Sequence, residues 1–250
     1  MEDNRSVFRS SLAIAVAIIV LGLAVAWGLA HIREDAGSIV VTGSAKKRIT
    51  SDLIVWKVTV NASSGQLSEA YRILSTNGPR VRQYLISKGI AENQIEALAI
   101  HTQVQREGQP VYDEARGRAE AQGRVLGYSL QQQFRVRSTE VEKVMQISRQ
   151  VTELINEGIL LESAAPEYLY TKLGDLKIAI MADAARDAKA RAVQIAGSTG
   201  ATLGDVRAAR MGVLQITPAD SVQVSDYGMN DTTALEKDVT AVVNVTFALK

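Results

Sequence analysis

An unbroken apolar run near the N-terminus constrains this chain more than any other feature of its sequence. Residues 12–30 read LAIAVAIIVLGLAVAWGLA, which is 19 positions without a charged side chain. As an α-helix this run would be about 29 Å long, close to the ~30 Å hydrocarbon core of a bilayer. A buried core helix rarely excludes polar residues over such a length. The run therefore predicts a transmembrane anchor over residues 12–32.

Charges on either side of the run predict its orientation. Arg5 and Arg9 precede it, and Arg33 follows it together with two acidic residues. Because the positively charged flank stays in the cytoplasm, residues 1–11 are expected to be cytoplasmic and the rest of the chain to be exported. A cleaved signal peptide is the alternative, since residues 24–26 form an A-x-A pattern. We favour the uncleaved anchor, because the run exceeds the roughly 7–15 apolar residues of a signal peptide.

The composition of the chain excludes several classes of function. It has no cysteine, and 28 Lys+Arg balance 27 Asp+Glu almost completely. Without cysteine there are no disulfides, thiolate metal sites or thiol nucleophiles. A nucleic-acid-binding domain carries a basic excess, so no nucleic-acid partner is expected.

Strands and helices alternate along residues 38–250, where period-two patterns predict strands and 3.6-residue patterns predict helices. The helix over Gln66–Lys88 is expected to continue through Gly78-Pro79, because its apolar stripe stays in phase across them. Thr139 and Glu142 predict a capping box at the start of a helix that ends near Glu157. A third helix is expected over Leu176–Gly197. The expected strands are Ser38–Ser44, Ile54–Asn61, Ile95–Arg106, Tyr128–Arg137, Ile159–Thr171, Leu203–Thr217 and Val239–Leu249. Pro166 is expected to make part of Ile159–Thr171 an edge or a bend.

The resulting order, β-β-α-β-β-α-β-α-β-β, predicts an α+β fold, a two-layer arrangement of a largely antiparallel sheet with packed helices. It contains β-α-β-β-α-β, the order of ferredoxin-like sandwiches. The alanines of the third helix are expected to let it lie close to the sheet, with a subunit contact as the alternative. These are Ala179, Ala182, Ala185, Ala188 and Ala192.

Four stretches follow one another in the order typical of a known family. They are IVVTGSAKKRITSDLIVWKVTV, LGYSLQQQFRVRSTEVEKVMQISRQVTELINEGI, AIMADAARDAKARAVQIAGSTGATLGDVRAARM and VTAVVNVTFAL. Together they resemble the SIMPL domain family, exported bacterial proteins of poorly defined biochemistry, over nearly all of residues 38–250. The resemblance implies an exported domain, and with the predicted anchor it gives a periplasmic domain on a single-pass inner-membrane protein. It brings no catalytic residues, and Ser51-Asp52 stands where the family often has Pro-Asp.

The residues themselves show no catalytic or metal-binding pattern. The glycine-rich stretch over residues 197–204 follows a helix, whereas a phosphate loop precedes one, so it predicts a helix end and a turn. His31 and His101 form no zinc motif. The acids of the segment Pro218–Asp238 do not match the spacing of a calcium loop. We therefore predict no catalytic, cofactor-binding or metal-binding residue and no cofactor.

Two long polar loops are the best candidates for contacts with a partner, although disorder is an alternative for both. Glu107–Gly123 contains Tyr112 and Pro218–Asp238 contains Tyr227, and each tyrosine offers an aromatic anchor. The favoured interpretation is a non-catalytic binding or scaffold module of the cell envelope, self-associating as a homo-oligomer and contacting an envelope protein. The alternative is a hydrolase or lyase that uses carboxylates such as Asp52 and Glu162, which would have to converge in one cleft.

Overall fold

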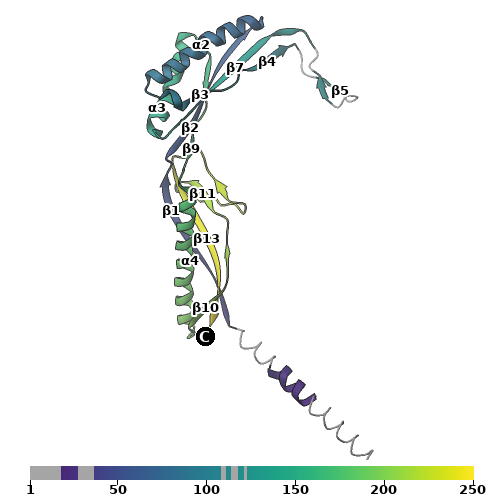
Figure 1. Cartoon of the computed structure of the whole chain (residues 1–250), viewed down its shortest axis with the longest axis vertical. Coiled ribbons are helices and arrows are strands. Elements are labelled where there is room, and N and C mark those ends of the chain that lie inside the picture. The colour runs from purple at the N-terminus through teal and green to yellow at the C-terminus, as the bar shows by residue number, and fades with distance from the viewer. Residues whose placement is uncertain (1–17, 28–36, 108–110, 114–117, 121–122) are drawn as a thin grey trace, which may run out of the picture. The chain divides into compact units, whose positions relative to one another are not determined.

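A computed structural model describes residues 18–27, 37–107, 111–113, 118–120 and 123–250 (Figure 1). Residues 18–27 are helical, and the rest of the predicted anchor over residues 12–32 lies outside the described residues. Within the described residues, no helix is both long enough and apolar enough to cross a membrane.

The chain forms two compact units. Unit 1 contains residues up to Lys46, residues 177–214 and residues 240–250, and unit 2 contains residues 47–176 and 215–239. Each unit is described by itself below. The long strands β1 (Ser38–Thr50) and β13 (Glu236–Leu249) contribute residues to both.

Unit 2 contains an antiparallel sheet with ferredoxin-like connectivity. Its two long strands, β2 (Leu53–Ser64) and β7 (Val125–Ser138), pair in the centre over eleven residues, from Ile54 opposite Ser138 to Ser64 opposite Tyr128. In the predicted β-α-β-β-α-β order, the second and fourth strands form the two edges of the sheet. Each of these edge strands is split into two short strands. These are β3 (Ile95–Ala97) and β4 (His101–Arg106) beside β7, and β8 (Leu161–Ser163) and β9 (Glu167–Leu169) beside β2. The predicted β-α-β-β-α-β order is therefore confirmed. The single strand expected over 95–106 was wrong, whereas the interruption expected at Pro166 separates β8 from β9.

Two helices, α2 (Leu67–Ser87) and α3 (Val141–Gln150), cover one face of this sheet (Figure 1). α2 continues through Pro79 as predicted, and a 3₁₀ turn (Val151–Glu157) extends α3. Alternate residues of β2 and β7 face these helices and form the core. The fully buried members include Ile54, Trp56, Val58, Val60, Leu74, Val81, Leu85 and Val136.

The predicted capping box at α3 was wrong. Glu140 is the N-cap residue, and no side chain caps the helix. The hydroxyl of Ser138 instead accepts a hydrogen bond from the backbone N–H of Glu140 at 3.1 Å. The side chain that turns the chain into the helix is therefore that of Ser138, one residue before Thr139, which the Thr139–Glu142 spacing indicated.

Short elements complete unit 2. β5 (Val111–Asp113) and β6 (Arg118–Glu120) pair as a hairpin within the first long loop, and a 3₁₀ turn (Glu92–Gln94) precedes β3. β11 (Gln215–Pro218) pairs in parallel with β12 (Met229–Asn230). The described strands thus belong to three sheets, where a single sheet was expected; their pairing is largely antiparallel, as predicted.

Unit 1 packs one long helix, α4 (Leu173–Ser198), on strands β1, β13 and β10 (Leu203–Met211). The buried residues of the helix within this unit recur every four positions and are all alanine after the first: Ile180, Ala184, Ala188, Ala192 and Ala196. Ala179, Ala182 and Ala185 are exposed, so the prediction that they face the sheet was wrong. Small side chains let α4 approach β1 closely at Gly43, where a Cβ atom would lie 2.2 Å from the carbonyl oxygen of Ala184.

Candidate functional site

A pocket of about 250 Å³ lies within unit 2, opposite the face of the sheet that α2 and α3 cover. Its walls come from segments that are far apart in the sequence, namely the end of β1, the start of β2, the end of β7, β9 with the segment after it, the first residue of α4, β11, the end of β12 and the start of β13. The lining residues are Ile49, Leu53, Arg137, Tyr168, Leu169, Tyr170, Thr171, Leu173, Ile216, Asn230, Asp231 and Lys237. The pocket is thus mostly apolar, with a small number of polar groups, as is typical of small-molecule sites.

Lys237 is the buried cation of the pocket, with only 2% of its surface exposed. Its Nζ donates hydrogen bonds to the carbonyl oxygens of Tyr168, at 2.7 Å, and of Asp231. The Asp231 carboxylate lies 3.6 Å away. Burial lowers the pKa of Lys237, and the attraction of Asp231 offsets this only in part. These contacts make Lys237 a cross-link between β9 and the segment before β13.

Asp231 is likewise committed to the fold. One carboxylate oxygen accepts hydrogen bonds from the backbone N–H and the hydroxyl of Thr233, at 3.2 and 2.7 Å, and the other accepts from the N–H of Ala234 at 3.0 Å. Burial on its own would raise the pKa of Asp231. The hydrogen bonds and the charge of Lys237 outweigh it, so the pKa lies below its usual range. Both oxygens of this carboxylate therefore already have donors.

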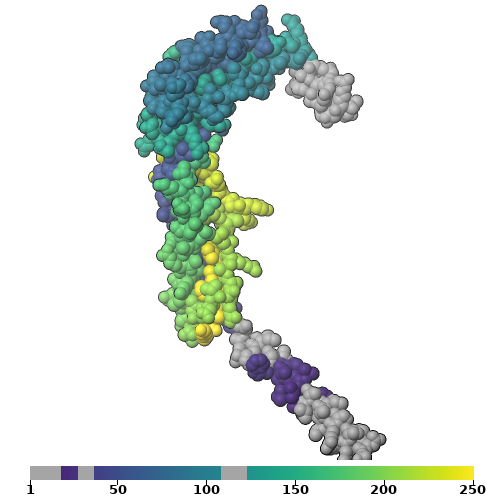
Figure 2. All heavy atoms as spheres, in the orientation of Figure 1, coloured from purple at the N-terminus to yellow at the C-terminus, as the bar shows by residue number. Residues whose placement is uncertain are grey.

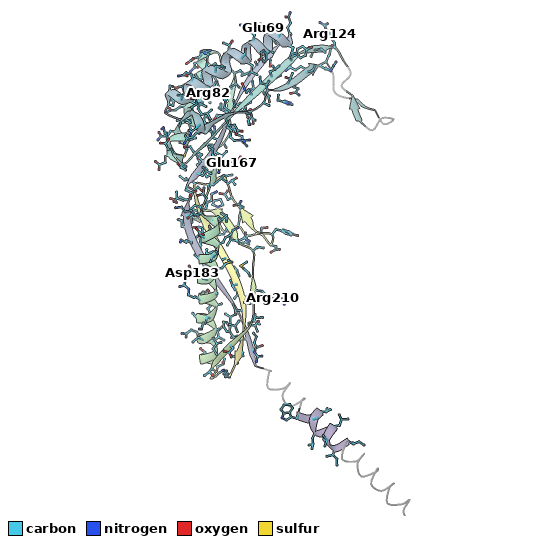
Figure 3. The ribbon with its side chains drawn as sticks, viewed as in Figure 1. Glu69, Arg82, Arg124, Glu167, Asp183 and Arg210 are labelled. Carbon is cyan, nitrogen blue, oxygen red and sulfur yellow. The ribbon has the colours of Figure 1, made fainter. Side chains whose placement is uncertain are left out.

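Arg137 is the exposed cation of the pocket. It stands near the end of β7, opposite Val55 of β2, on the face of the sheet away from the helices. Within the part of the chain that the structure describes, its guanidinium makes no hydrogen bond or ion pair. Arg135, two residues earlier on the same face, is bound to Glu96 at 3.1 Å. Glu167, labelled in Figure 3, lies across Val55 from Arg137 and is bound to Lys57 at 3.4 Å.

Asp52 fixes the segment that forms one wall of the pocket. Its two carboxylate oxygens accept hydrogen bonds from the N–H and the hydroxyl of Thr171, each at 2.7 Å. Burial would raise the pKa of Asp52, but the hydrogen bonds from Thr171, helped by the charge of Lys172, hold it below its usual range. Its role is to hold the chain between β9 and α4 against the turn between β1 and β2.

A second buried carboxylate, Asp238, secures the start of β13 beside Lys237. Asp238 accepts hydrogen bonds from Nε and Nη2 of Arg48 at 3.0 and 3.1 Å and from the N–H of Asp220 at 2.9 Å. The side chain of Asp220 also binds Arg48. The hydrogen bonds that Arg48 donates to Asp238 and then to Asp220 raise the pKa of Arg48 further. β1 and β13 are thereby held together beneath the pocket.

The structure does not bring together the two carboxylates of the enzyme alternative. Asp52 precedes the first residue of β2, and Glu162 lies opposite Thr59. At about 3.3 Å per residue these positions are about 23 Å apart along the strand. The expected cleft with Asp52 and Glu162 on its walls is therefore not formed by these two residues.

The two tyrosines predicted as partner contacts have different outcomes. Tyr112 lies on β5, and its side chain is outside what the structure describes. Tyr227 lies in the segment between β11 and β12 and is 96% exposed. Val222 and Val224 of the same segment are 93% and 82% exposed. Figure 2 shows this yellow-green segment standing out from the surface of unit 2.

The other residues considered for metal binding are dispersed. His31 lies outside the described residues, and His101 is exposed on β4. Of the acids in the segment 218–238, Asp220 binds Arg48 and Asp231 caps its own turn. Among the described residues, no three His, Asp or Glu side chains come close enough together to hold a metal ion.

Lys237 and Arg137 are the pocket residues that sequence reasoning missed. A signal for Lys237 was present: in β13 the inward-facing positions are odd-numbered, such as 239, 241 and 243, and Lys237 continues that series. A lysine in phase with an apolar face needs a buried partner. Arg137 lies on the face of β7 away from the helices, and nothing in the sequence indicated that a pocket would form there.

Unit 2 is an α+β fold with ferredoxin-like connectivity, in which the helices cover one face of the sheet and the pocket lies on the other face. The family description "SIMPL: Protein of unknown function (DUF541)" matches residues 39–247. The chain therefore belongs to the SIMPL family, as its motifs predicted. No curated protein matches the chain.

Proposed function

We propose that this protein is a non-catalytic binding module, held at the periplasmic face of a bacterial inner membrane, and that the unit 2 pocket is its binding site. The pocket's own chemistry carries the proposal. Lys237 and Asp231, its buried ionisable groups, are both occupied by hydrogen bonds within the protein. A general acid, base or nucleophile must be free to act on a substrate.

Attachment to a membrane rests on the sequence of the N-terminal segment. Residues 12–30 are uncharged and apolar, with arginines preceding them. A tether of this kind would keep the binding module at the membrane surface, where its ligand or partner would be met.

Contact with an envelope protein partner and self-association are further parts of the proposal. Exposed apolar side chains at Val222, Val224 and Tyr227 support the partner contact, because such groups gain most from burial in an interface. The exposed strand β10 supports self-association. It pairs with β13 on one side, and Val206 and Met211 are 57% and 65% exposed.

Ligand-observed NMR on the full chain in detergent tests the central claim. A set of neutral, anionic and cationic single-ring compounds would be compared on the wild type and on L173W, which fills the pocket from a half-buried position on its wall. We expect some compounds to bind the wild type, to lose binding to L173W and to be recovered unchanged. If every bound compound still binds L173W, the pocket is not the site. Conversion of a pocket-bound compound would favour the enzyme alternative.

A further inference from the structure

The unit 2 pocket carries one positive charge that has no acidic partner among the residues that the structure describes. Lys237 and Asp231 are a buried pair of opposite charge, and both already make hydrogen bonds within the protein. Arg137 has no hydrogen bond or ion pair within the described part of the chain. Two neighbouring cations on its face of the sheet do have acidic partners: Arg135 has Glu96, and Lys57 has Glu167. Only Arg137, of these three, is therefore left to meet a ligand.

The rest of the pocket is suited to a small apolar body. Ile49, Leu53 and Ile216 are buried aliphatic side chains of its wall, and Tyr170 adds aromatic surface. A volume of about 250 Å³ lies below the ~300–1,000 Å³ typical of sites for drug-sized ligands. The space fits a single ring or a short chain.

We propose that the pocket binds a small organic anion, in which one carboxylate on a single ring or short apolar chain pairs with Arg137. This rests on the proposed binding function and adds the chemical class of the ligand. A guanidinium presents two parallel N–H donors to a carboxylate, a geometry that a neutral ligand cannot use fully. Arg137, which has no acidic partner among the described residues, matches a ligand that carries one negative charge.

Benzoate and its neutral isostere benzamide test the role of the charge. Titrations of the full chain in detergent would use the wild type, R137Q and R135Q. Arg135 is a matched control, because it lies two residues from Arg137 on the same face but outside the pocket wall. We expect the wild type to bind benzoate at least tenfold more tightly than benzamide. We expect R137Q to lose at least tenfold for benzoate and less than twofold for benzamide, and R135Q to change neither by more than twofold.

The outcomes separate this inference from the proposed function. Equal affinities for benzoate and benzamide, both lost in L173W, would overturn the anion assignment and leave the pocket as a binding site. Benzoate binding that survives R137Q would overturn it in the same way. Failure of both probes to bind the wild type would also overturn it, and the wider compound set would then decide the proposed function separately. Circular dichroism of R137Q and R135Q shows whether each variant is folded.

Discussion

Gly43 of β1 lies directly against Ala188 of α4, so that a Cβ atom at position 43 would be 2.3 Å from the Ala188 amide nitrogen and 2.6 Å from its Cβ. The N–H of the next residue, Ser44, donates a hydrogen bond of 2.8 Å to Asp187 of the same helix. A strand and a helix thus meet backbone to backbone, and a single side-chain carboxylate binds the strand's N–H at the contact.

Replacing Gly43 should therefore separate the helix from the strand. We expect G43A to reduce the free energy of unfolding by about 1–3 kcal/mol or more, because backbone atoms rather than a mobile side chain would have to move. Chemical denaturation of the full chain in detergent, followed by circular dichroism, measures the loss. G197A is the matched control: it lies in α4 with open space around it, and alanine should be neutral or up to about 1 kcal/mol better there. Equal stabilities of G43A and the wild type would contradict the close contact.

Asp52 should make the stability of unit 2 depend on pH. Its pKa is lowered in the folded chain, so its contribution is complete above the pKa of an unfolded aspartate, about 3.9, and disappears as the pH falls through the folded value. We expect D52N to cost about 1–2 kcal/mol at neutral pH through weakened hydrogen bonds to Thr171. The difference from the wild type should shrink as the pH falls below 4. E162Q, an exposed change, is the control, and a difference that stayed constant with pH would argue against this role of Asp52.

Removing the buried ammonium group should be more costly than removing an exposed one. K237M leaves the carbonyl oxygens of Tyr168 and Asp231 without a donor and the Asp231 carboxylate without its nearby cation, so we expect a loss of about 3 kcal/mol. K57M removes a solvent-exposed ion pair and should cost less than about 1 kcal/mol. The double variant K237M/D231N should recover part of the loss in denaturation experiments. If K237M and K57M were equally mild, Lys237 would not be the cross-link described above.

The N-terminal segment should place the rest of the chain outside the cytoplasm. Alkaline phosphatase fused after Lys250 is expected to be active and β-galactosidase at the same position inactive, because Arg5 and Arg9 keep the short N-terminus inside. An epitope placed before residue 12 should remain on the mature chain if the segment is an uncleaved anchor. The reverse activities of the two reporters would refute export, and loss of the epitope would indicate a signal peptide.

Self-association through β10 should be sensitive to charge at its exposed positions. We expect light scattering of the full chain in detergent to show an oligomer, which V206K/M211K dissociates. I178K is the control, because Ile178 is an exposed side chain of the same unit on α4 instead of β10. A wild-type chain that is monomeric at all concentrations would count against self-association.

Local sequence patterns predicted an element of this fold well where the pattern was compatible with only one secondary structure. The helix through Pro79 was predicted because the apolar positions on either side keep one phase, and only one face of α2 is buried. The strand Ile95–Arg106 failed because its regular pairing with β7 is interrupted between Ala97 and His101, where Leu98 keeps a hydrogen bond to β7, and periodicity does not report such an interruption. Alanines occur on several faces of α4, so their spacing alone could not select Ala184 and Ala196 over Ala179 and Ala182.

The pocket could not be predicted from local patterns. Leu53, Tyr168, Ile216 and Lys237 come from four segments, and their meeting depends on how β9, β11 and β13 pair. The role of Asp52 illustrates the same point. Its position after the turn was visible in the sequence, but its partner Thr171 lies 119 residues away.

The four-residue repeat of buried positions in α4, from Ile180 to Ala196, determines how this helix can evolve. An α-helix turns about 100° per residue, so each step of four advances the contact line by about 40° and the whole series by about 160°. The strands beneath must follow that rotation, as the twist of a sheet allows. Point substitutions on the exposed faces leave the contact line intact, whereas deletion of one residue would rotate everything after it by about 100°. A one-residue deletion in α4 should therefore disturb its packing more than a point substitution on one of its exposed faces.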